Sequence, residues 1–330
     1  MSTDATSGDP DAHAVVDRFL TDMEAYGKSP RTLAEYRRVL EGFAAEIDAD
    51  PATAERGDCM EYVASLRRRD LSPSSIATYA TYVHRFYGYL VKAEEFERTT
   101  NPMALVMEEM EEGIDKNPRR RELDVADIVR FLESVNHPRD RCMLLVLFKT
   151  GIRAGELANL TLDDVSLDPE LDDRYGIGGN ALLNARSLYV ASDVPGNKRE
   201  RDTLIPLDDE VVREIERWLR VRPDGDSDAL FVSLSPASSG GLSPESVARI
   251  MRKYTREHGW WSPDDDLRRN VTPHYCRHFF TTYLRDASGD DALVKYLRGD
   301  VGGDAIETYT HQWGDTVREK YEEYIYELLT

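Results

Sequence analysis

Apolar residues recur every three or four positions through the first hundred residues, and this helical period is the feature that most constrains the fold. The pattern begins near Ala14 and starts again at Ser29-Pro30, at Thr53 and at Ser72-Pro73. Proline after a serine is a common helix start, because the first helical position needs no backbone N–H. We therefore predict a domain of about four helices at 13–100, after a disordered N-terminus at 1–12.

The pattern changes after residue 100. Residues 101–121 are predicted to be a linker, because they contain Asn101-Pro102, an acidic stretch and a run of three arginines. A second domain follows at 122–330, and a length of 330 residues suits two domains. Its segment 141–149 is a nearly continuous apolar run, which predicts a buried helix.

Two short segments of this second domain are typical of strands. Residues 187–191 and 203–207 flank a charged turn, so we expect an antiparallel hairpin between helices. The last segment, 315–330, is amphipathic and either packs on its own core or docks on a neighbouring protomer. The predicted fold class is mainly α with a small antiparallel sheet.

Composition restricts the compartment and the chemistry. No stretch of 18 apolar residues is present, and the polar, acidic N-terminus does not resemble a signal peptide, so we expect a cytoplasmic protein. The three cysteines, Cys59, Cys142 and Cys276, lie far apart, which predicts reduced, packed thiols and no metal site.

The charge argues against a simple nucleic-acid partner. Lys+Arg number 42 and Asp+Glu 62, a net charge of −20 spread over both halves. One interpretation is a protein of a molar-salt cytoplasm, as in halophilic archaea, where the Debye length of about 3 Å screens repulsion from DNA. The other is an acidic protein from ordinary salt that never meets DNA.

Four segments carry residues suited to phosphate chemistry. Arg153 follows a glycine turn at a helix start, where backbone N–H groups also favour anions. Lys198 lies in the hairpin turn, His274 and Arg277 share a helix face, and Tyr309 lies near the C-terminus. Each alone has an ordinary interpretation as a surface arginine, a charged turn, a common pair or a packing tyrosine. Their order along the chain is the informative feature.

That order resembles the tyrosine recombinase family, the phage-integrase and Xer-like enzymes. TGIRAGEL at 150–157 is similar to the first arginine box, TPHYCRHFFTTYL at 272–284 to the His-x-x-Arg box, and ETYTH at 307–311 to the nucleophile box. The resemblance covers residues from about 14 to 313. It implies a SAM-like helical core-binding domain followed by a recombinase catalytic domain.

The resemblance also implies a mechanism. Arg153 and Arg277 would hold the phosphate, Tyr309 would attack it, and Lys198 would protonate the leaving oxygen. His274 would assist proton movement at the tyrosine. Neither cofactor nor metal is expected, since the bond energy is kept in a 3′-phosphotyrosine. Four protomers would join two recombination sites of double-stranded DNA, and accessory factors are left open.

Two positions depart from the family pattern. The family usually has histidine or tryptophan nine residues before the nucleophile, and here Asp300 occupies that place. A carboxylate would repel phosphate, so Asp300 orients Tyr309 or an arginine, or else catalysis is weakened. The family's usual hairpin lysine is replaced by Pro195, which leaves Lys198 as the candidate. Glu156 is expected to brace the arginine helix.

Basic residues predicted to contact DNA lie in three clusters. They are Arg67, Arg68 and Arg69, then Arg119, Arg120 and Arg121, and in the hairpin Arg199 and Arg201. The central cluster is equally compatible with a solvated linker. Two rival functions remain open: a degenerate recombinase that holds DNA without cutting it, motivated by Asp300, and a type IB topoisomerase-like enzyme with the same chemistry.

Overall fold

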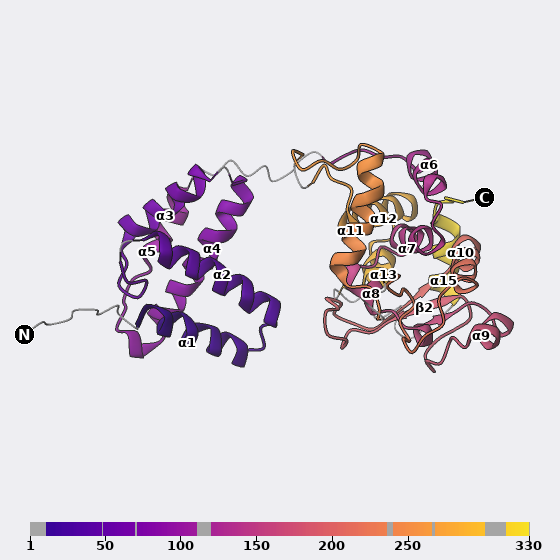
Figure 1. Ribbon diagram of the computed structural model, residues 1–330, viewed down its shortest axis with the longest axis horizontal. Helices are drawn as coiled ribbons and strands as arrows, with labels where there is room; N and C mark the ends of the chain where they lie inside the picture. Colours follow the sequence, from indigo (N-terminus) through magenta and orange to yellow (C-terminus); the bar gives the residue numbers. More distant parts are fainter. Residues whose placement is uncertain are drawn as a thin grey trace, which may run out of the picture. The chain divides into compact units, whose positions relative to one another are not determined.

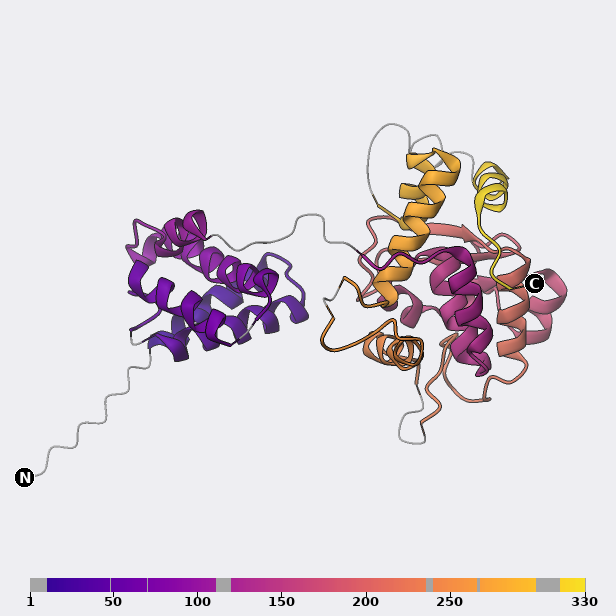
Figure 2. The same cartoon turned by 90° about the horizontal axis from the view of Figure 1, so that it is seen from above.

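The computed structural model describes residues 11–47, 49–69, 71–110, 120–235, 240–265, 268–300 and 315–329. The chain divides into two compact units, Met1–Asn117 and Pro118–Thr330. Figures 1 and 2 show the helices of each unit from two directions. The two units are described in turn.

The first unit is helical throughout its described part, as the apolar period predicts. Its elements are α1 (Asp11–Ala25), α2 (Pro30–Glu46), α3 (Arg56–Arg68), α4 (Pro73–Lys92), the short 3₁₀ helix η1 (Glu94–Phe96) and α5 (Pro102–Glu109). The Ser-Pro starts are confirmed, because the Ser29 and Ser72 hydroxyls each accept a hydrogen bond at 3.2 Å from the backbone three residues on. Aromatic rings such as Phe19, Phe43 and Phe86 fill the core.

The predicted start of the linker at residue 101 is wrong. Residues 102–109 form α5, whose apolar face includes Met103 and Val106, both buried in the core of the first unit. The helix is capped by the Asn101 side chain, which accepts a hydrogen bond from the Met103 N–H at 3.0 Å. The acidic residues after α5 led to the prediction of a solvated linker. The segment is helical and packed because Met103 and Val106, one turn apart, are buried in the core.

The second unit surrounds a buried helix with further helices and one small sheet. Its elements are α6 (Val125–Ser134), α7 (Pro138–Thr150), α8 (Ala154–Asn159), η2 (Leu162–Asp164), β1 (Val165–Ser166), α9 (Pro169–Tyr175), β2 (Ser187–Val190), β3 (Thr203–Pro206), α10 (Asp209–Leu219), α11 (Pro244–Glu257), α12 (Pro273–Ser288), α13 (Asp291–Arg298) and α15 (Asp315–Tyr324). Helix α7 packs against α10 and α12, which confirms the predicted buried helix.

The sheet is antiparallel, with the order β1-β2-β3. The predicted hairpin is confirmed by the pairing of β2 with β3, in which Tyr189 lies opposite Leu204. Strand β1 was not predicted, because a two-residue strand is too short to show a period of two. The turn that carries Lys198 connects β2 to β3, so the pairing register of these strands fixes where the turn begins.

The C-terminal segment packs on its own unit. Tyr321 and Tyr326 are buried, and the Tyr321 hydroxyl donates to the Lys149 carbonyl at 2.9 Å. The Lys149 ammonium is itself fully buried between Asp208 at 2.6 Å and Glu210 at 2.7 Å. The C-terminal segment therefore packs on the core of its own unit, which is the first of the two predicted alternatives. No helix in the described ranges is both long and apolar enough to cross a membrane.

The assignment of α5 to the first unit can be tested by stability. We predict that Met103→Ala lowers the free energy of unfolding of this unit by about 2–5 kcal/mol, because it opens a cavity in the core. Leu105→Ala, on the exposed side of α5, should change it by about 0.5 kcal/mol or less.

Denaturant unfolding can separate the two units optically. All four tryptophans follow residue 217, so tryptophan fluorescence reports the second unit and circular dichroism reports both. Met103→Ala should shift only the circular dichroism transition. Equal effects of Met103→Ala and Leu105→Ala would contradict a packed α5.

Candidate active site

Arg153 is held at the start of a short helix by a buried carboxylate. Helix α7 ends at Gly151 in the left-handed conformation (φ +62°), and Arg153 then becomes the N-cap of α8. Glu156 accepts the Arg153 backbone N–H on Oε2 at 2.9 Å and its Nη1 on Oε1 at 2.8 Å. The predicted bracing role of Glu156 is confirmed by these contacts.

Arg277 projects from α12 into the same region and is 3% exposed. Its Nη1 donates to the Gly151 carbonyl at 2.9 Å, and its Nη2 donates to the Arg298 carbonyl at 3.0 Å. The ends of α7 and α13 therefore fix its guanidinium through backbone atoms. His274, one turn earlier on α12, is exposed.

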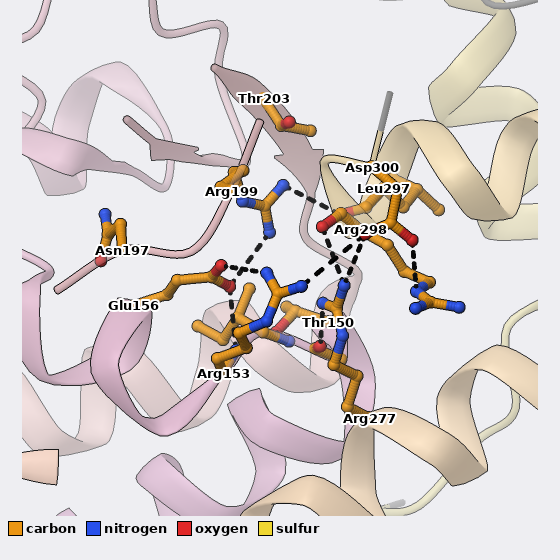
Figure 3. Close-up of polar contacts among 12 residues, drawn as sticks. Thr150, Arg153, Glu156, Asn197, Arg199, Thr203, Arg277, Leu297, Arg298 and Asp300 are labelled. Carbon is orange, nitrogen blue, oxygen red and sulfur yellow. Dashed lines mark hydrogen bonds and ion pairs between the residues drawn. The ribbon is translucent and has the colours of Figure 1, made fainter. Parts of the chain in front are cut away.

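Arg199 has a different place from the predicted one. Its side chain is fully buried, and its Nη2 contacts Glu156 Oε2 at 3.3 Å, while its Nη1 donates to the Leu297 carbonyl at 3.1 Å (Figure 3). A Cβ on Gly299 would lie 2.2 Å from Arg199 Cγ, so the close approach requires glycine there. A guanidinium buried against Glu156 and the Leu297 carbonyl does not fit the expected DNA contact.

Asp300 follows the end of α13 and contacts the arginines of the site. Its Oδ1 lies 3.2 Å from Arg277 Nη2 and 3.7 Å from Arg153 Nη2, and its Oδ2 lies 3.0 Å from Arg298 Nε. Figure 3 shows the Arg153 and Arg277 guanidiniums between Glu156 on one side and Asp300 on the other. Asp300 therefore contacts the two predicted phosphate-binding arginines, one of the alternatives that its sequence position allowed.

The concentration of positive charge changes the acidity of the groups around it. Burial, together with the charges of Arg153 and Arg298, lowers the pKa of Arg277 to about 10. Partial desolvation and the nearby arginines, Arg120 first among them, lower the pKa of His274, which favours its neutral form. Burial opposes the ionisation of Glu156, but Arg199 and the hydrogen bonds from Arg153 outweigh it and lower the Glu156 pKa.

The hairpin turn is hydrogen-bonded to α8, whereas its lysine, Lys198, is exposed. Asn159 Nδ2 donates to Asn197 Oδ1 at 2.9 Å and to the Pro195 carbonyl at 3.1 Å, which ties the turn to the helix that begins at Arg153. Lys198 lies next to the buried Arg199 with its own side chain in solvent. Tyr309, the predicted nucleophile, lies outside the described residues, as does Arg119.

The other predicted DNA contacts differ in exposure. Arg67, Arg68 and Arg69 are exposed at the end of α3, and Arg69 pairs with Glu46. Arg121 is half-buried and donates to the Arg269 carbonyl at 3.1 Å, with Asp265 at 3.5 Å. The Arg201 guanidinium packs 4.9 Å from the centre of the Tyr296 ring. Arg120 is half-buried.

A basic face on α11 escaped the sequence analysis. Four exposed cations follow one another at helical spacing along this helix: Arg249, Arg252, Lys253 and Arg256. The guanidiniums of Arg252 and Arg256 each lie 4.8 Å from the centre of the Trp261 ring. The i, i+3, i+4, i+7 spacing of the cations could have revealed this face in the sequence.

The geometry defines a class of enzyme. Two guanidiniums that share one anionic oxygen, with an imidazole of lowered pKa near them, suit a phosphodiester that undergoes phosphoryl transfer. The phage integrase family matches residues 121–313, and the phage integrase N-terminal SAM-like domain matches residues 15–95. The chain belongs to the phage integrase family and is a tyrosine recombinase.

Proteins named tyrosine recombinases are similar to this chain over more than nine-tenths of its length. The tyrosine recombinase XerA of Pyrococcus furiosus is 27% identical over 315 residues, covering 93% of both chains. The tyrosine recombinase XerC of Escherichia coli O157:H7 is 29% identical over 314 residues, covering 91% of this chain and 92% of its own.

Solved structures share the fold. The Tn1549 transposon integrase in complex with a circular intermediate DNA has a TM-score of 0.65 at 16% identity, covering 94% of this chain and 98% of that one. The lambda integrase dimer bound to a COC′ core site has a TM-score of 0.62 at 17% identity, covering 92% and 97%. The predicted fold class, a SAM-like helical domain followed by a recombinase catalytic domain, is confirmed.

The buried Glu156 carboxylate gives a direct test of how the site is held. We predict that Glu156→Gln lowers the free energy of unfolding of the second unit by about 3–5 kcal/mol, since it leaves the buried Arg199 without a counter-charge. Tryptophan fluorescence during denaturant unfolding would measure the loss. The control is Glu170→Gln, which removes an exposed partner of Arg174 and should cost about 1 kcal/mol or less. Similar small losses in both variants would contradict the role of Glu156.

Proposed function

We propose that the chain is a site-specific DNA recombinase that cleaves and rejoins strands through a 3′-phosphotyrosyl bond to Tyr309. The observation that supports this proposal best is the position shared by Arg153 and Arg277. The two guanidiniums approach the same carboxylate oxygen, Asp300 Oδ1, at 3.7 and 3.2 Å. A non-bridging oxygen of a phosphodiester has the same charge and hydrogen-bonding needs.

The chemistry follows from the acidity of the groups. A tyrosine hydroxyl, with its ordinary pKa of about 10, is a weak nucleophile until its proton is removed and the phosphate is polarised. His274, whose pKa is lowered by desolvation and the nearby arginines, accepts that proton and also hydrogen-bonds the phosphate. Arg153 and Arg277 stabilise the charge that grows on the non-bridging oxygens.

Bond making and breaking then balance without a cofactor. The Tyr309 oxygen bonds to phosphorus while the bond from phosphorus to the 5′ oxygen breaks. The leaving oxygen takes a proton from Lys198, whose exposed place in the hairpin turn lets it reach a bound strand. A 5′-hydroxyl from another strand attacks the phosphotyrosine and reverses the step, so rejoining needs no external energy.

Partners and compartment belong to the same proposal. The lambda integrase is known as a tetramer bound to a Holliday junction, and we propose that four copies of this chain likewise join two recombination sites of double-stranded DNA. The net charge of −20 supports action in a cytoplasm of high salt, as in halophilic archaea, where screening lets local arginine contacts decide binding.

One observation favours a second function. Asp300 puts a negative charge beside Arg153 and Arg277, the two arginines proposed to bind the phosphate, as expected of a degenerate recombinase that holds DNA and does not cut it. The two functions differ in a single product, the covalent protein–DNA adduct.

Covalent trapping distinguishes them. The protein would be incubated in molar KCl with nicked fragments of the DNA that flanks its gene, and denaturing gels would reveal adducts. We predict an adduct in the wild type and in Tyr324→Phe, a control at a half-buried tyrosine of α15. Tyr309→Phe should form none. Specific DNA binding without any wild-type adduct would favour the non-cutting function.

The basic face of α11 supports a DNA contact in the second unit. We predict that Arg252→Ala weakens DNA binding at all salt concentrations and lowers the slope of log affinity against log salt by about 1, because one phosphate contact is lost. Arg220→Ala is the control, since this exposed arginine pairs with Glu216 on α10. Fluorescence anisotropy over a KCl series would measure both, and identical slopes in the two variants would exclude α11 from the interface.

A further inference from the structure

Two carboxylates neutralise the arginines of the site, and they are held very differently. Glu156 is 1% exposed and contacts Arg153 and Arg199 through both of its oxygens. The Asp300 side chain is 28% exposed, and its contact with Arg153 is as long as 3.7 Å. Asp300 also lies beyond the end of α13, where its N–H donates to the Lys295 carbonyl at 3.0 Å. The first carboxylate is therefore enclosed in the core. The second is partly exposed, and its shorter contacts are with Arg277 at 3.2 Å and Arg298 at 3.0 Å.

The arginines need an anion whether or not DNA is bound. Arg153, Arg277 and Arg298 all contact the one Asp300 carboxylate. The positive charges of these arginines repel one another. Burial and the charges of Arg153 and Arg298 lower the pKa of Arg277 to about 10. Asp300 and a phosphodiester each carry one negative charge, so exchanging one for the other leaves the charge of the site unchanged.

We propose that the Asp300 carboxylate is a built-in substitute for the scissile phosphate. It keeps Arg153 and Arg277 assembled in the DNA-free protein and turns away when a phosphodiester takes its place. This inference rests on the proposed function, since it assumes that the arginine pair binds the phosphate. Phosphate binding then competes with the Asp300 side chain. The apparent phosphate affinity is the intrinsic affinity multiplied by the fraction of sites from which Asp300 has turned away.

Inorganic phosphate tests the exchange without DNA or Tyr309. Isothermal titration calorimetry at one fixed KCl concentration would compare the full-length wild type with Asp300→Asn and Asp300→Ala. Both variants should bind phosphate about tenfold more tightly, which corresponds to a wild-type site closed about nine-tenths of the time. The control is Asp291→Asn at the first residue of α13, which removes the same charge from an exposed pair with Arg285 and should leave the affinity at the wild-type value.

Three results would overturn the proposal. One is an affinity of both Asp300 variants within about twofold of the wild type, and another is an equal gain in Asp291→Asn, which would indicate a general charge effect. The third is that neither variant folds even with phosphate present, judged by tryptophan fluorescence, because Asp300 would then be a fixed part of the scaffold. Failure of covalent trapping with a retained phosphate response would instead reject the cutting reaction alone.

Discussion

The contact between the buried Glu156 carboxylate and two arginines is the interaction on which the rest of the site depends. Glu156 joins Arg153, at the start of α8, to Arg199, in the segment after the hairpin turn. Arg199 reaches onward to the carbonyl of Leu297 near the end of α13. Three segments far apart in the sequence are thus joined by ion pairs and a hydrogen bond at buried side chains, where an unpaired partner is costly. The position of Arg153 is a consequence of this network.

The same network explains how an acidic chain can carry a local excess of positive charge. The net charge is −20, yet the site itself gathers four guanidiniums against the two carboxylates of Glu156 and Asp300. Backbone carbonyls of Gly151 and Arg298 fix Arg277 without adding further negative charge. A local excess of positive charge is therefore preserved inside a negative molecule. Global charge alone was a poor guide to function, because the arrangement of a few buried groups decides it.

The sequence predicted many of the features that depend on local patterns. Most of the longer helices and the β2–β3 hairpin follow from periodicity and turn residues, and the family follows from the spacing of its motifs. Contacts between distant segments could not be predicted in this way. Arg199 looked like any other arginine of a charged turn, and only the packing of α13 against it shows that it is buried. Helix α5 was missed because its two core residues stand beside an acidic stretch.

The difference between the two carboxylates connects stability with function. In a site made only of arginines, the like charges would repel one another and the site would not assemble without its substrate. In a site neutralised by two fixed carboxylates, the phosphate would have no arginine left to bind. Glu156, buried and held through both oxygens, serves assembly. Asp300, partly exposed beyond the end of a helix, has the weaker hold expected of a group that must leave. In the proposed exchange, an aspartate at a place where the family usually has histidine or tryptophan is compatible with catalysis, because it would neutralise the arginines only while the phosphate is absent.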